Sequence, residues 1–347
     1  MRMTGEAFGW RAVRIAAFAL ASILMLAHTT TTAVAAEKIS FWVVRDPQNA
    51  TQIALANRLG YFKDAGLDVD LHWVTTFTDL YAPVGAESVD FTVTTFNNAL
   101  KWHQDNVPMR YIAIVTDIAG GQGVAINPAA VKQPSDFEKI KIAMSTGASV
   151  EDAIREFCKA YNLDFAKLQF VNLQAPDQLS ALANGQVQAI AVWQPWLYRA
   201  TTEFGAKMYF TGRDSFIPGA TGKVSWLYLP SGVLASTKIL KERPQAAQAV
   251  IKAVLRAQSF LLKQPDKAAA LIASDLKVSQ KMMIALLPYN TYTATIDDAV
   301  KGGFTAVQDD MIRQKILRSK TEMISMFDFG PLREVAPQLI QIKEAAR

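Results

Sequence analysis

The chain has 347 residues, of which half are hydrophobic and 19% are charged, with a formal net charge of +5 at pH 7. This mild charge forms no basic stripe, so the composition excludes a typical nucleic-acid-binding protein. The single cysteine, Cys158, excludes an intramolecular disulfide and a cysteine-rich metal site. Its place on an apolar helix face predicts a residue of the core.

The first 36 residues have the composition of a secretory signal peptide. Arg2, Arg11 and Arg14 form a positive region, residues 15–26 are apolar, and small residues at 33–36 offer a cleavage site. The apolar run is too short for a membrane anchor, which needs about 20 residues. The sequence therefore predicts export to the periplasm through the Sec pathway. Removal of these 36 residues leaves a chain of 311 residues with a formal net charge of +3, which is long enough for two domains.

The mature chain begins with a strand, a helix and a second strand, predicted over residues 39–44, 50–66 and 67–74. β-branched and aromatic runs form both strands, and Gly60 is placed to end a helix. A strand–helix–strand start predicts a parallel sheet. The same patterns predict further strands over residues 88–95, 110–116 and 123–127, and a helix over 96–106.

A second α/β unit is predicted beyond residue 123. Its strands are expected over residues 139–145, 168–173, 187–193 and 207–211, with helices over 146–161 and 176–185, the latter capped by Asp177. A polar, Gly-rich loop is expected over 212–225, a returning strand over 227–236, and helices from Pro244 onward, with Val250, Val254, Ala257 and Leu261 on one face.

Two passages of the chain between lobes follow from this order of elements. The predicted domains are the signal peptide (1–36), the first part of lobe 1 (37–123), lobe 2 (124–226), and the return to lobe 1 with the C-terminal helices (227–347). Gly120, Gly121 and Gly123 fit a hinge or turn. Ligands of open α/β sheets bind beyond the carboxyl ends of the strands, so a cleft between the lobes is the expected binding site.

The sequence offers no catalytic, metal-binding or cofactor-binding motif. His72 and His103 stand in no pattern that pairs histidine with a nucleophile or a metal ligand. The segment "GATGKV" (219–224) fails the phosphate-loop pattern, because Ile217 replaces a required glycine and Val224 a required serine or threonine. We therefore expect a binding protein without cofactor or metal.

Three segments together resemble one protein family. "GYFKDAGLDVDL", "VGAESVDFTVTTFNNAL" and "LSALANGQVQAIAVWQPW" are similar, in this order, to segments of the periplasmic substrate-binding proteins of ABC importers for nitrate, sulfonates, taurine and thiamine precursors, the NMT1/THI5-like family. The likeness covers residues 39–240. Glu87 stands where glycine is common in the family, and Gln188 where aspartate is usual.

This resemblance implies a fold, a location and partners. The fold is the two-lobed α/β periplasmic binding protein type II, in which each lobe is a mixed, mostly parallel sheet flanked by helices and the ligand cleft lies between the lobes. The partners are a small-molecule ligand and the permease and ATPase subunits of an ABC transporter. We expect a monomer in the periplasm that does not bind nucleic acid.

Loops that follow the predicted strands would line the cleft. Trp193 would present its ring as a wall at the end of a strand that Pro195 ends, while Trp196 is equally well explained as a surface residue. The predicted ligand-binding residues are Arg45, Gln48, Asn49, Thr94, Thr95, Asn97, Gly121, Ser145, Thr146, Ser149, Trp193, Pro195 and Trp226.

Serine, threonine and asparagine gather at the start of one predicted helix in each lobe. Helix N-termini carry unpaired amide donors and suit anions, although the same residues also serve as ordinary helix caps. Arg45 would add a positive charge for an oxyanion. Asp46 would either pair with Arg45 or accept an amine of a zwitterionic ligand.

The predicted function is the capture of a small anion, an aliphatic sulfonate, a taurine-like solute or a carboxylate, for an ABC importer. One alternative is a ligand of the thiamine-pyrimidine type or another heterocycle. Another is an enzyme of the thiamine-pyrimidine synthase type, although the cysteine-rich motif and site histidines of that branch are missing here. A module that senses the ligand for a membrane receptor would share the same cleft.

Overall fold

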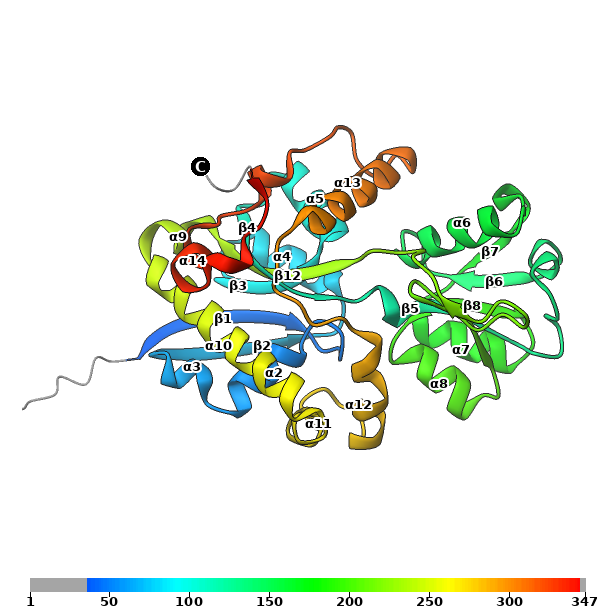
Figure 1. The fold of residues 1–347 in the computed structure, drawn as a ribbon, viewed down its shortest axis with the longest axis horizontal. Coiled ribbons are helices and arrows are strands. Elements are labelled where there is room, and N and C mark those ends of the chain that lie inside the picture. Colours follow the sequence, from blue (N-terminus) through cyan, green and yellow to red (C-terminus); the bar gives the residue numbers. More distant parts are fainter. Residues whose placement is uncertain (1–35, 344–347) are drawn as a thin grey trace, which may run out of the picture. The chain divides into compact units, whose positions relative to one another are not determined.

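A computed structural model describes residues 36–343 of the chain. The predicted signal peptide therefore lies outside the described residues, apart from Ala36. Among residues 36–343, no helix combines the length and the apolar character needed to cross a bilayer. The strands form two sheets, and helices flank each of them (Figure 1).

The first sheet has the strand order β2–β1–β3–β12–β4. Its strands are β1 (Glu37–Val44), β2 (Leu67–Val74), β3 (Phe91–Thr95), β4 (Met109–Asp117) and β12 (Pro230–Ser236). β1 runs parallel to β2 and β3, as the strand–helix–strand start predicts. β12 runs antiparallel to β3 and β4, because it enters at Pro230, opposite the residue Asp117 where β4 leaves.

The helices that flank the first sheet pack on one apolar core. They are α2 (Thr51–Arg58), α3 (Tyr61–Asp64), α4 (Tyr81–Gly85), α5 (Phe96–Gln104), α9 (Thr237–Glu242), α10 (Pro244–Lys263), α11 (Pro265–Ile272), α12 (Gln280–Leu286), α13 (Asp298–Arg313) and α14 (Gly330–Val335). Gly60 adopts a φ of +71° between α2 and α3, which confirms that it ends the first helix. The predicted face of α10, from Val250 to Leu261, is buried in this core.

The second sheet has the strand order β11–β10–β9–β5–β8–β6–β7. Its strands are β5 (Gln122–Ile126), β6 (Lys141–Met144), β7 (Gln169–Asn172), β8 (Ala189–Trp193), β9 (Lys207–Thr211), β10 (Asp214–Ser215) and β11 (Gly222–Lys223). β6 runs parallel to β7 and β8, whereas β5 runs antiparallel to β8 and β9. Both sheets are therefore mixed, as predicted, with their parallel pairings among the strands of the strand–helix–strand units.

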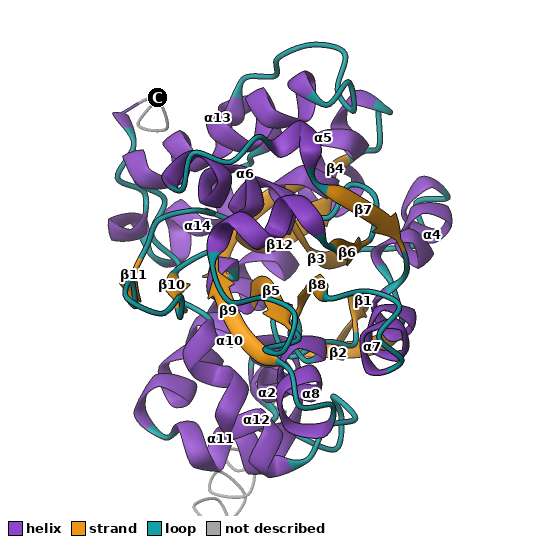
Figure 2. Cartoon of the chain, turned by 90° about the vertical axis from the view of Figure 1, so that its right-hand side faces the viewer, coloured by secondary structure: helices purple, strands orange, loops and turns teal. Residues whose placement is uncertain are grey.

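Alternating side chains give this second sheet two buried faces. Ile142 packs with α6 (Val150–Ala160) on one face, whereas its neighbour Ala143 packs with α7 (Ala175–Ala183) and α8 (Trp196–Glu203) on the other. Figure 2 shows α6 on one side of these strands and α7 and α8 on the other. Burial on both faces explains the continuous apolar sequence of β8, AIAVW.

The chain passes between the two sheets twice, and the two passages are hydrogen-bonded to each other. Residues 118–121 follow β4, and residues 224–229 lead into β12. Ile118 N donates to Leu229 O (3.0 Å), and Leu229 N donates to Asp117 Oδ1 (3.0 Å). We call residues 37–117 and 230–343 the first half and residues 118–229 the second half. The predicted lobe boundaries of 123 and 226 stay a prediction.

Two local predictions are wrong. The Gly-rich segment 212–225 is not only a loop, because β10 and β11 pair in it as a short antiparallel hairpin. Asp177 does not cap α7, because the capping position is Gln174 and Asp177 lies in the first turn. Pro176 near the helix start favours this earlier beginning, since proline needs no hydrogen-bond partner in the first turn.

Candidate ligand-binding cleft

Four of the predicted loops begin where strands of the two sheets end. Residues 45–49 follow β1, Thr95 to Asn97 lie at the junction of β3 and α5, residues 145–149 follow β6, and residues 194–195 follow β8. Carboxyl ends of parallel strands are the usual position of ligands in open α/β sheets. These four loops are therefore the framework of the candidate site.

A direct hydrogen bond joins the two halves at the starts of α5 and α6. Asn97 Nδ2 donates to Ser149 Oγ at 3.0 Å, and Thr95 Oγ1 donates to Asn97 Oδ1. Thr95 and Ser149 hold the capping positions of α5 and α6, yet neither side chain accepts a hydrogen bond from a backbone N–H of its own helix. Thr95 Oγ1 accepts instead from Asn98 Nδ2 at 3.3 Å. The alternative that these hydroxyls serve as ordinary helix caps is wrong for both residues.

A cavity of about 210 Å³ lies beside this hydrogen bond. Both halves line it, since α5 and α13 come from the first half and the start of α6 from the second. The lining residues are Asn97, Asn98, Lys101, Gly147, Ala148, Ser149, Asp152, Leu229, Val307, Asp310, Met311, Gln314 and Ile316. This volume is below the 300–1,000 Å³ typical of drug-sized ligands, so it suits a small solute.

Asp152 gives the cavity a carboxyl group that the sequence prediction did not include. Burial, followed by repulsion from Glu151, raises the pKa of Asp152 to about 6, while Arg313 and Arg155 act in the opposite direction. Its Oδ1 atom is buried and accepts no hydrogen bond within the described residues. A buried polar atom left unpaired costs about 1–3 kcal/mol, so this oxygen is available to a ligand or a water molecule.

Asp152, Lys101 and Asp310 were missed because nothing in their local sequence marks them. Asp152 is one of two acids in the first turn of α6, where acids commonly interact favourably with the helix dipole. Asp310 lies 158 residues further along the chain, on α13, and the two meet only through the tertiary fold. A pattern within one segment could not have found this pair.

Asp46, Gln48 and Asn49 form a network of hydrogen bonds in the loop that follows β1. Asp46 Oδ1 accepts hydrogen bonds from Gln48 N (2.7 Å) and Asn49 N (2.9 Å), and Oδ2 accepts from Asn49 Nδ2 (3.1 Å). Burial raises the pKa of Asp46 while these bonds lower it. Asn49 Oδ1 accepts from Ser231 Oγ of β12 at 2.6 Å. This network ties β1 to β12, so Gln48 and Asn49 have a clear structural role.

Gln48 also connects the first half with the passage to the second. Its Nε2 donates to Ile118 O (3.2 Å), and its Oε1 accepts from Gln122 Nε2 (3.1 Å). A Cβ atom at Gly121 would lie 2.2 Å from Gln48 Nε2, so glycine is needed for this approach. At the neighbouring Gly120, a Cβ atom would lie 2.4 Å from the carbonyl oxygen of Tyr289.

Arg45 is turned toward another part of the first half. Its Nη1 donates to Asp275 O at 2.5 Å, and its guanidinium lies 4.7 Å from the ring centre of Trp73. The predicted Arg45–Asp46 pair does not form, because Asp46 is occupied by Gln48 and Asn49. The structure thus does not bring Arg45 together with Asn97 and Ser149.

Of the remaining predicted residues, Ser145, Thr146, Trp193 and Pro195 lie at the ends of second-half strands, whereas Thr94 lies within β3 and Trp226 in the passage that leads into β12. Thr94 Oγ1 is buried without a hydrogen-bond partner in the described chain. Ser145 Oγ donates to Leu173 O (2.9 Å), and exposed Thr146 donates its backbone N–H to Asn172 Oδ1 (3.0 Å). Both therefore brace the end of β6 against the strand beside it, β7.

The aromatic residues divide into one at a strand end and one in the passage that leads into β12. Trp193 is half-buried as the last residue of β8, paired with Gln122, and Pro195 follows through a cis peptide bond. Trp226 packs edge-on against Phe210, with ring centres 5.2 Å apart, beside the second-half core. Both tryptophans are half-buried against a core, and Trp193 is the one that lies at the end of a strand.

Cys158 has the properties of a core residue. It is buried on α6, and burial raises the pKa of its thiol to about 11. The thiolate is the reactive form of cysteine, so this thiol is a poor nucleophile at neutral pH.

Comparison with known proteins agrees with this two-sheet architecture. Residues 47–268 match the model of the NMT1/THI5-like family, and the chain belongs to this family. A putative aliphatic sulfonates-binding protein of Bacillus subtilis is 23% identical over 288 residues, which cover 81% of this chain and 83% of that protein.

Solved structures show the same fold at low identity. The periplasmic aliphatic sulphonate binding protein SsuA from Escherichia coli aligns with a TM-score of 0.69 and 15% identity, over 84% of this chain and 92% of that one. The periplasmic nitrate-binding protein NrtA from Synechocystis PCC 6803 aligns with a TM-score of 0.67 and 16% identity, over 88% and 89%. The fold is therefore that of a periplasmic binding protein, as predicted.

One structural relative is an enzyme. The desulfurization enzyme DSZB aligns with a TM-score of 0.66 and 14% identity, over 87% of this chain and 99% of that one. The fold alone therefore does not separate binding proteins from enzymes.

Proposed function

We propose that the protein is a periplasmic solute-binding protein that captures a small organic anion between its two halves and delivers it to the permease of an ABC importer. An aliphatic sulfonate, a taurine-like solute or a carboxylate fits this role. The B. subtilis relative is described as a putative sulfonate-binding protein, which supports the ligand class. The periplasmic location is supported by the signal-like first 36 residues.

The observation that carries the proposal is the meeting of two helix starts from different halves. No side chain of a capping residue occupies the first-turn amides of α5 or α6, and Asn97 and Ser149 bridge the two helix starts. In α6 the amides of Glu151 and Asp152 already donate to Ala148 O (3.0 Å) and Ser149 O (3.2 Å), so there the helix dipole and the Ser149 hydroxyl would hold the anion. The dipole favours an anion by about 0.3–1 kcal/mol per helix, and by more in a partly buried setting. An oxyanion held by both starts would draw the halves together.

The acidic lining of the cavity supports a zwitterionic version of the ligand. The unpaired Asp152 carboxyl lies in the first turn of α6, three residues after Ser149, and lines the same cavity, so the amine of a taurine-like solute would meet it there. Half-buried Trp193 lies at the end of β8 and outside the lining of this cavity, so it would form an aromatic wall only for a ligand that extends beyond the cavity.

Opening and closing would take place about the two passages between the halves. Residues 118–121 and 224–229 are the segments that cross, and ligand binding would shift the balance toward the closed arrangement. The proposal is for a binding protein rather than an enzyme, and the unreactive state of Cys158 supports this choice.

A thermal-unfolding panel tests the proposal. The protein is heated with ethanesulfonate, taurine, nitrate, butyrate or a hydroxymethylpyrimidine, with ethyl methyl sulfone as an uncharged counterpart of the sulfonate. A ligand at 100 times its Kd stabilises the fold by about 2.7 kcal/mol, or several degrees for a chain of this size. We expect an organic anion to stabilise and the sulfone to have no effect. Stabilisation by the pyrimidine alone would contradict the proposal.

A further inference from the structure

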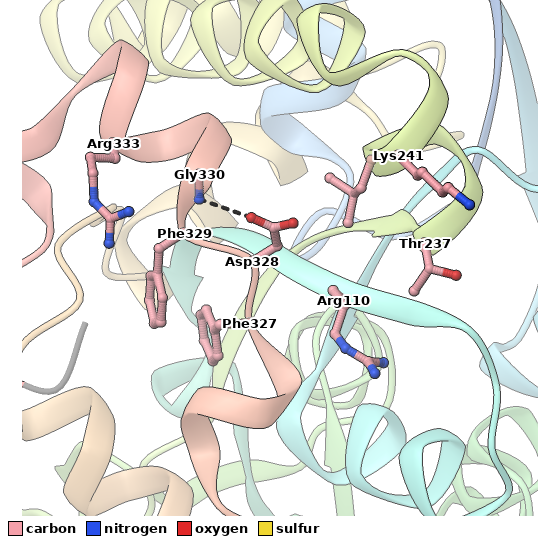
Figure 3. A pocket seen from close by; sticks show the side chains of 9 residues that line it. Arg110, Thr237, Lys241, Phe327, Asp328, Phe329, Gly330 and Arg333 are labelled. Carbon is pink, nitrogen blue, oxygen red and sulfur yellow. Dashed lines mark hydrogen bonds between the residues drawn. The ribbon is translucent and has the colours of Figure 1, made fainter. Parts of the chain in front are cut away.

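A second pocket, of about 540 Å³, lies entirely within the first half (Figure 3). It is formed by β4, α9 and the residues that lead into α14, and none of its lining residues belongs to the cleft described above. Its volume is within the 300–1,000 Å³ range of small-molecule sites. The proposed transport function does not use it.

The pocket carries more positive than negative charge. Arg110, Lys241 and Arg333 line it together with one carboxylate, Asp328. Asp328 Oδ1 accepts a hydrogen bond from Gly330 N at 2.9 Å, so this carboxylate serves the start of α14. The side chains that line the pocket therefore include three cations and one anion, and that anion is already hydrogen-bonded.

Lys241 has no partner within the described part of the chain, and Arg110 keeps most of its donors. Arg110 donates through Nη1 to the carbonyl of its neighbour Met109 (2.9 Å), which leaves the other N–H groups of the guanidinium for a ligand. By contrast Arg243, two residues beyond Lys241, pairs with Glu37 and Asp90. Lys238, one turn before Lys241, is also an exposed lysine without a partner in the described residues, so what distinguishes Lys241 is its position on the lining of the pocket.

Two aromatic rings give the pocket an apolar wall. Phe327 and Phe329 are stacked, with centres 5.1 Å apart and an interplanar angle of 9°. Phe327 is also stacked on buried Tyr111 of β4 (5.1 Å, 27°), which fixes the pair against the core. Figure 3 shows the guanidinium groups of Arg110 and Arg333 on opposite sides of the two rings.

From these features we propose that this pocket is a second ligand site that binds a small organic acid, an oxyanion carried on an aromatic or aliphatic ring. The guanidinium groups match carboxylate and phosphate oxygens through paired hydrogen bonds. The phenyl rings cover the ring of the ligand. Neither an inorganic ion nor an uncharged ring uses both parts of the pocket.

Isothermal titration calorimetry with phenyl phosphate tests the proposal on the protein produced from the full chain. Inorganic phosphate and phenol serve as probes that lack the ring or the charge. We expect phenyl phosphate to bind more tightly than either. The double variant Arg110→Gln/Lys241→Gln should weaken this binding by about tenfold or more, because it removes two charged donors.

Two further variants separate the parts of the pocket. Phe329→Leu should weaken the binding of phenyl phosphate and leave that of inorganic phosphate unchanged. Lys238→Gln is the matched control, because Lys238 is an exposed lysine on the same helix that does not line the pocket. We expect it to change the affinity by less than about twofold.

Three results would overturn the proposal. The first is equal binding of phenyl phosphate by the wild type and the double variant, in proteins whose thermal unfolding is unchanged. The second is loss of binding in Ser149→Ala, which would place the probe in the cleft between the halves. The third is tighter binding of a short polyglutamate peptide than of phenyl phosphate, lost in the double variant, which would make the occupant a segment of an acidic protein.

Discussion

Asp117 and Asp152 are both carboxylates where the two halves meet, and they differ in how fully their hydrogen-bonding capacity is used. Asp117 accepts from Ala119 N and Leu229 N, both at 3.0 Å, and pairs with Arg213. Asp152 keeps a buried oxygen without a partner and has a raised pKa. A carboxylate with full hydrogen bonding holds the passages in place, whereas one left unpaired is available to a solute.

The largest expected effect is the loss of stability when Asp117, the fully hydrogen-bonded carboxylate, is replaced. Asp117→Ala leaves two buried amides and Arg213 without their acceptor, so we expect a loss of about 3–5 kcal/mol in the free energy of unfolding. Urea denaturation measures it. Asp214→Ala is the control, because Asp214 pairs with exposed Lys223 and should cost less than about 1 kcal/mol. Equal losses in the two variants would remove the special role of Asp117.

Gly120 and Gly121, in the passage of residues 118–121 that Asp117 holds in place, should differ in how much stability they lose when replaced by alanine. At Gly120 an added methyl group meets the backbone oxygen of Tyr289, which cannot move alone, so Gly120→Ala should destabilise the fold by about 2–3 kcal/mol. At Gly121 it meets the flexible end of Gln48, whose displacement should cost about 1–2 kcal/mol in lost hydrogen bonds. Thermal unfolding should rank them in this order, and the reverse ranking would contradict the described packing.

Loss of the hydrogen bond between Asn97 and Ser149, which joins the two halves, should affect ligand binding more than stability. Asn97→Ala and Ser149→Ala each remove one hydrogen-bonding group from the helix starts, so each should weaken binding of the best anion of the panel by about two- to tenfold. Calorimetry measures the affinity, and the double variant shows whether the two residues act together. Ser180→Ala, on an exposed face of α7, should have no effect. Unchanged affinity in both single variants would exclude this position as the anion site.

The smallest expected effect is the pH dependence that Asp152 introduces. Because its pKa is raised from 3.8 to about 6, the folded protein holds a proton between these values that the unfolded chain releases, and stability falls as pH rises through this window. Asp152→Asn should therefore unfold at a higher temperature than the wild type at pH 8, and at a similar temperature near pH 4. Ser180→Ala, an exposed change on α7, should leave the pH dependence of the unfolding temperature unchanged.

Absence of a pH-dependent difference between Asp152→Asn and the wild type would show that this carboxyl is well solvated. In that case the cavity would hold water in the protein without ligand, and the contrast between Asp117 and Asp152 would lose its basis.

The fold was predictable because its signals are local. Period-two burial and apolar runs placed most of the strands, Gly60 ended α2, and the motif around Trp193 indicated the family. The hairpin of β10 and β11 was not predictable, because each strand has two residues and pairs through the tertiary arrangement.

The candidate site was predictable only where a residue acts through its place at the end of a strand. Asn97 and Ser149 were found in this way, and the structure joins them. Arg45 was chosen for its charge beside a strand end, yet its side chain reaches Asp275, 230 residues away in sequence. Where a long side chain points depends on distant neighbours, which a single sequence does not reveal.

The most direct test of the proposed cleft is a crystal structure of the protein with the anion that stabilises it most. We expect the oxyanion to lie at the starts of both α5 and α6, about 3 Å from a first-turn amide nitrogen of α5 and within hydrogen-bonding reach of Asn97 and Ser149. An anion bound to one half alone, or held only in the pocket of Arg110 and Lys241, would contradict the proposal that the two halves close on the solute.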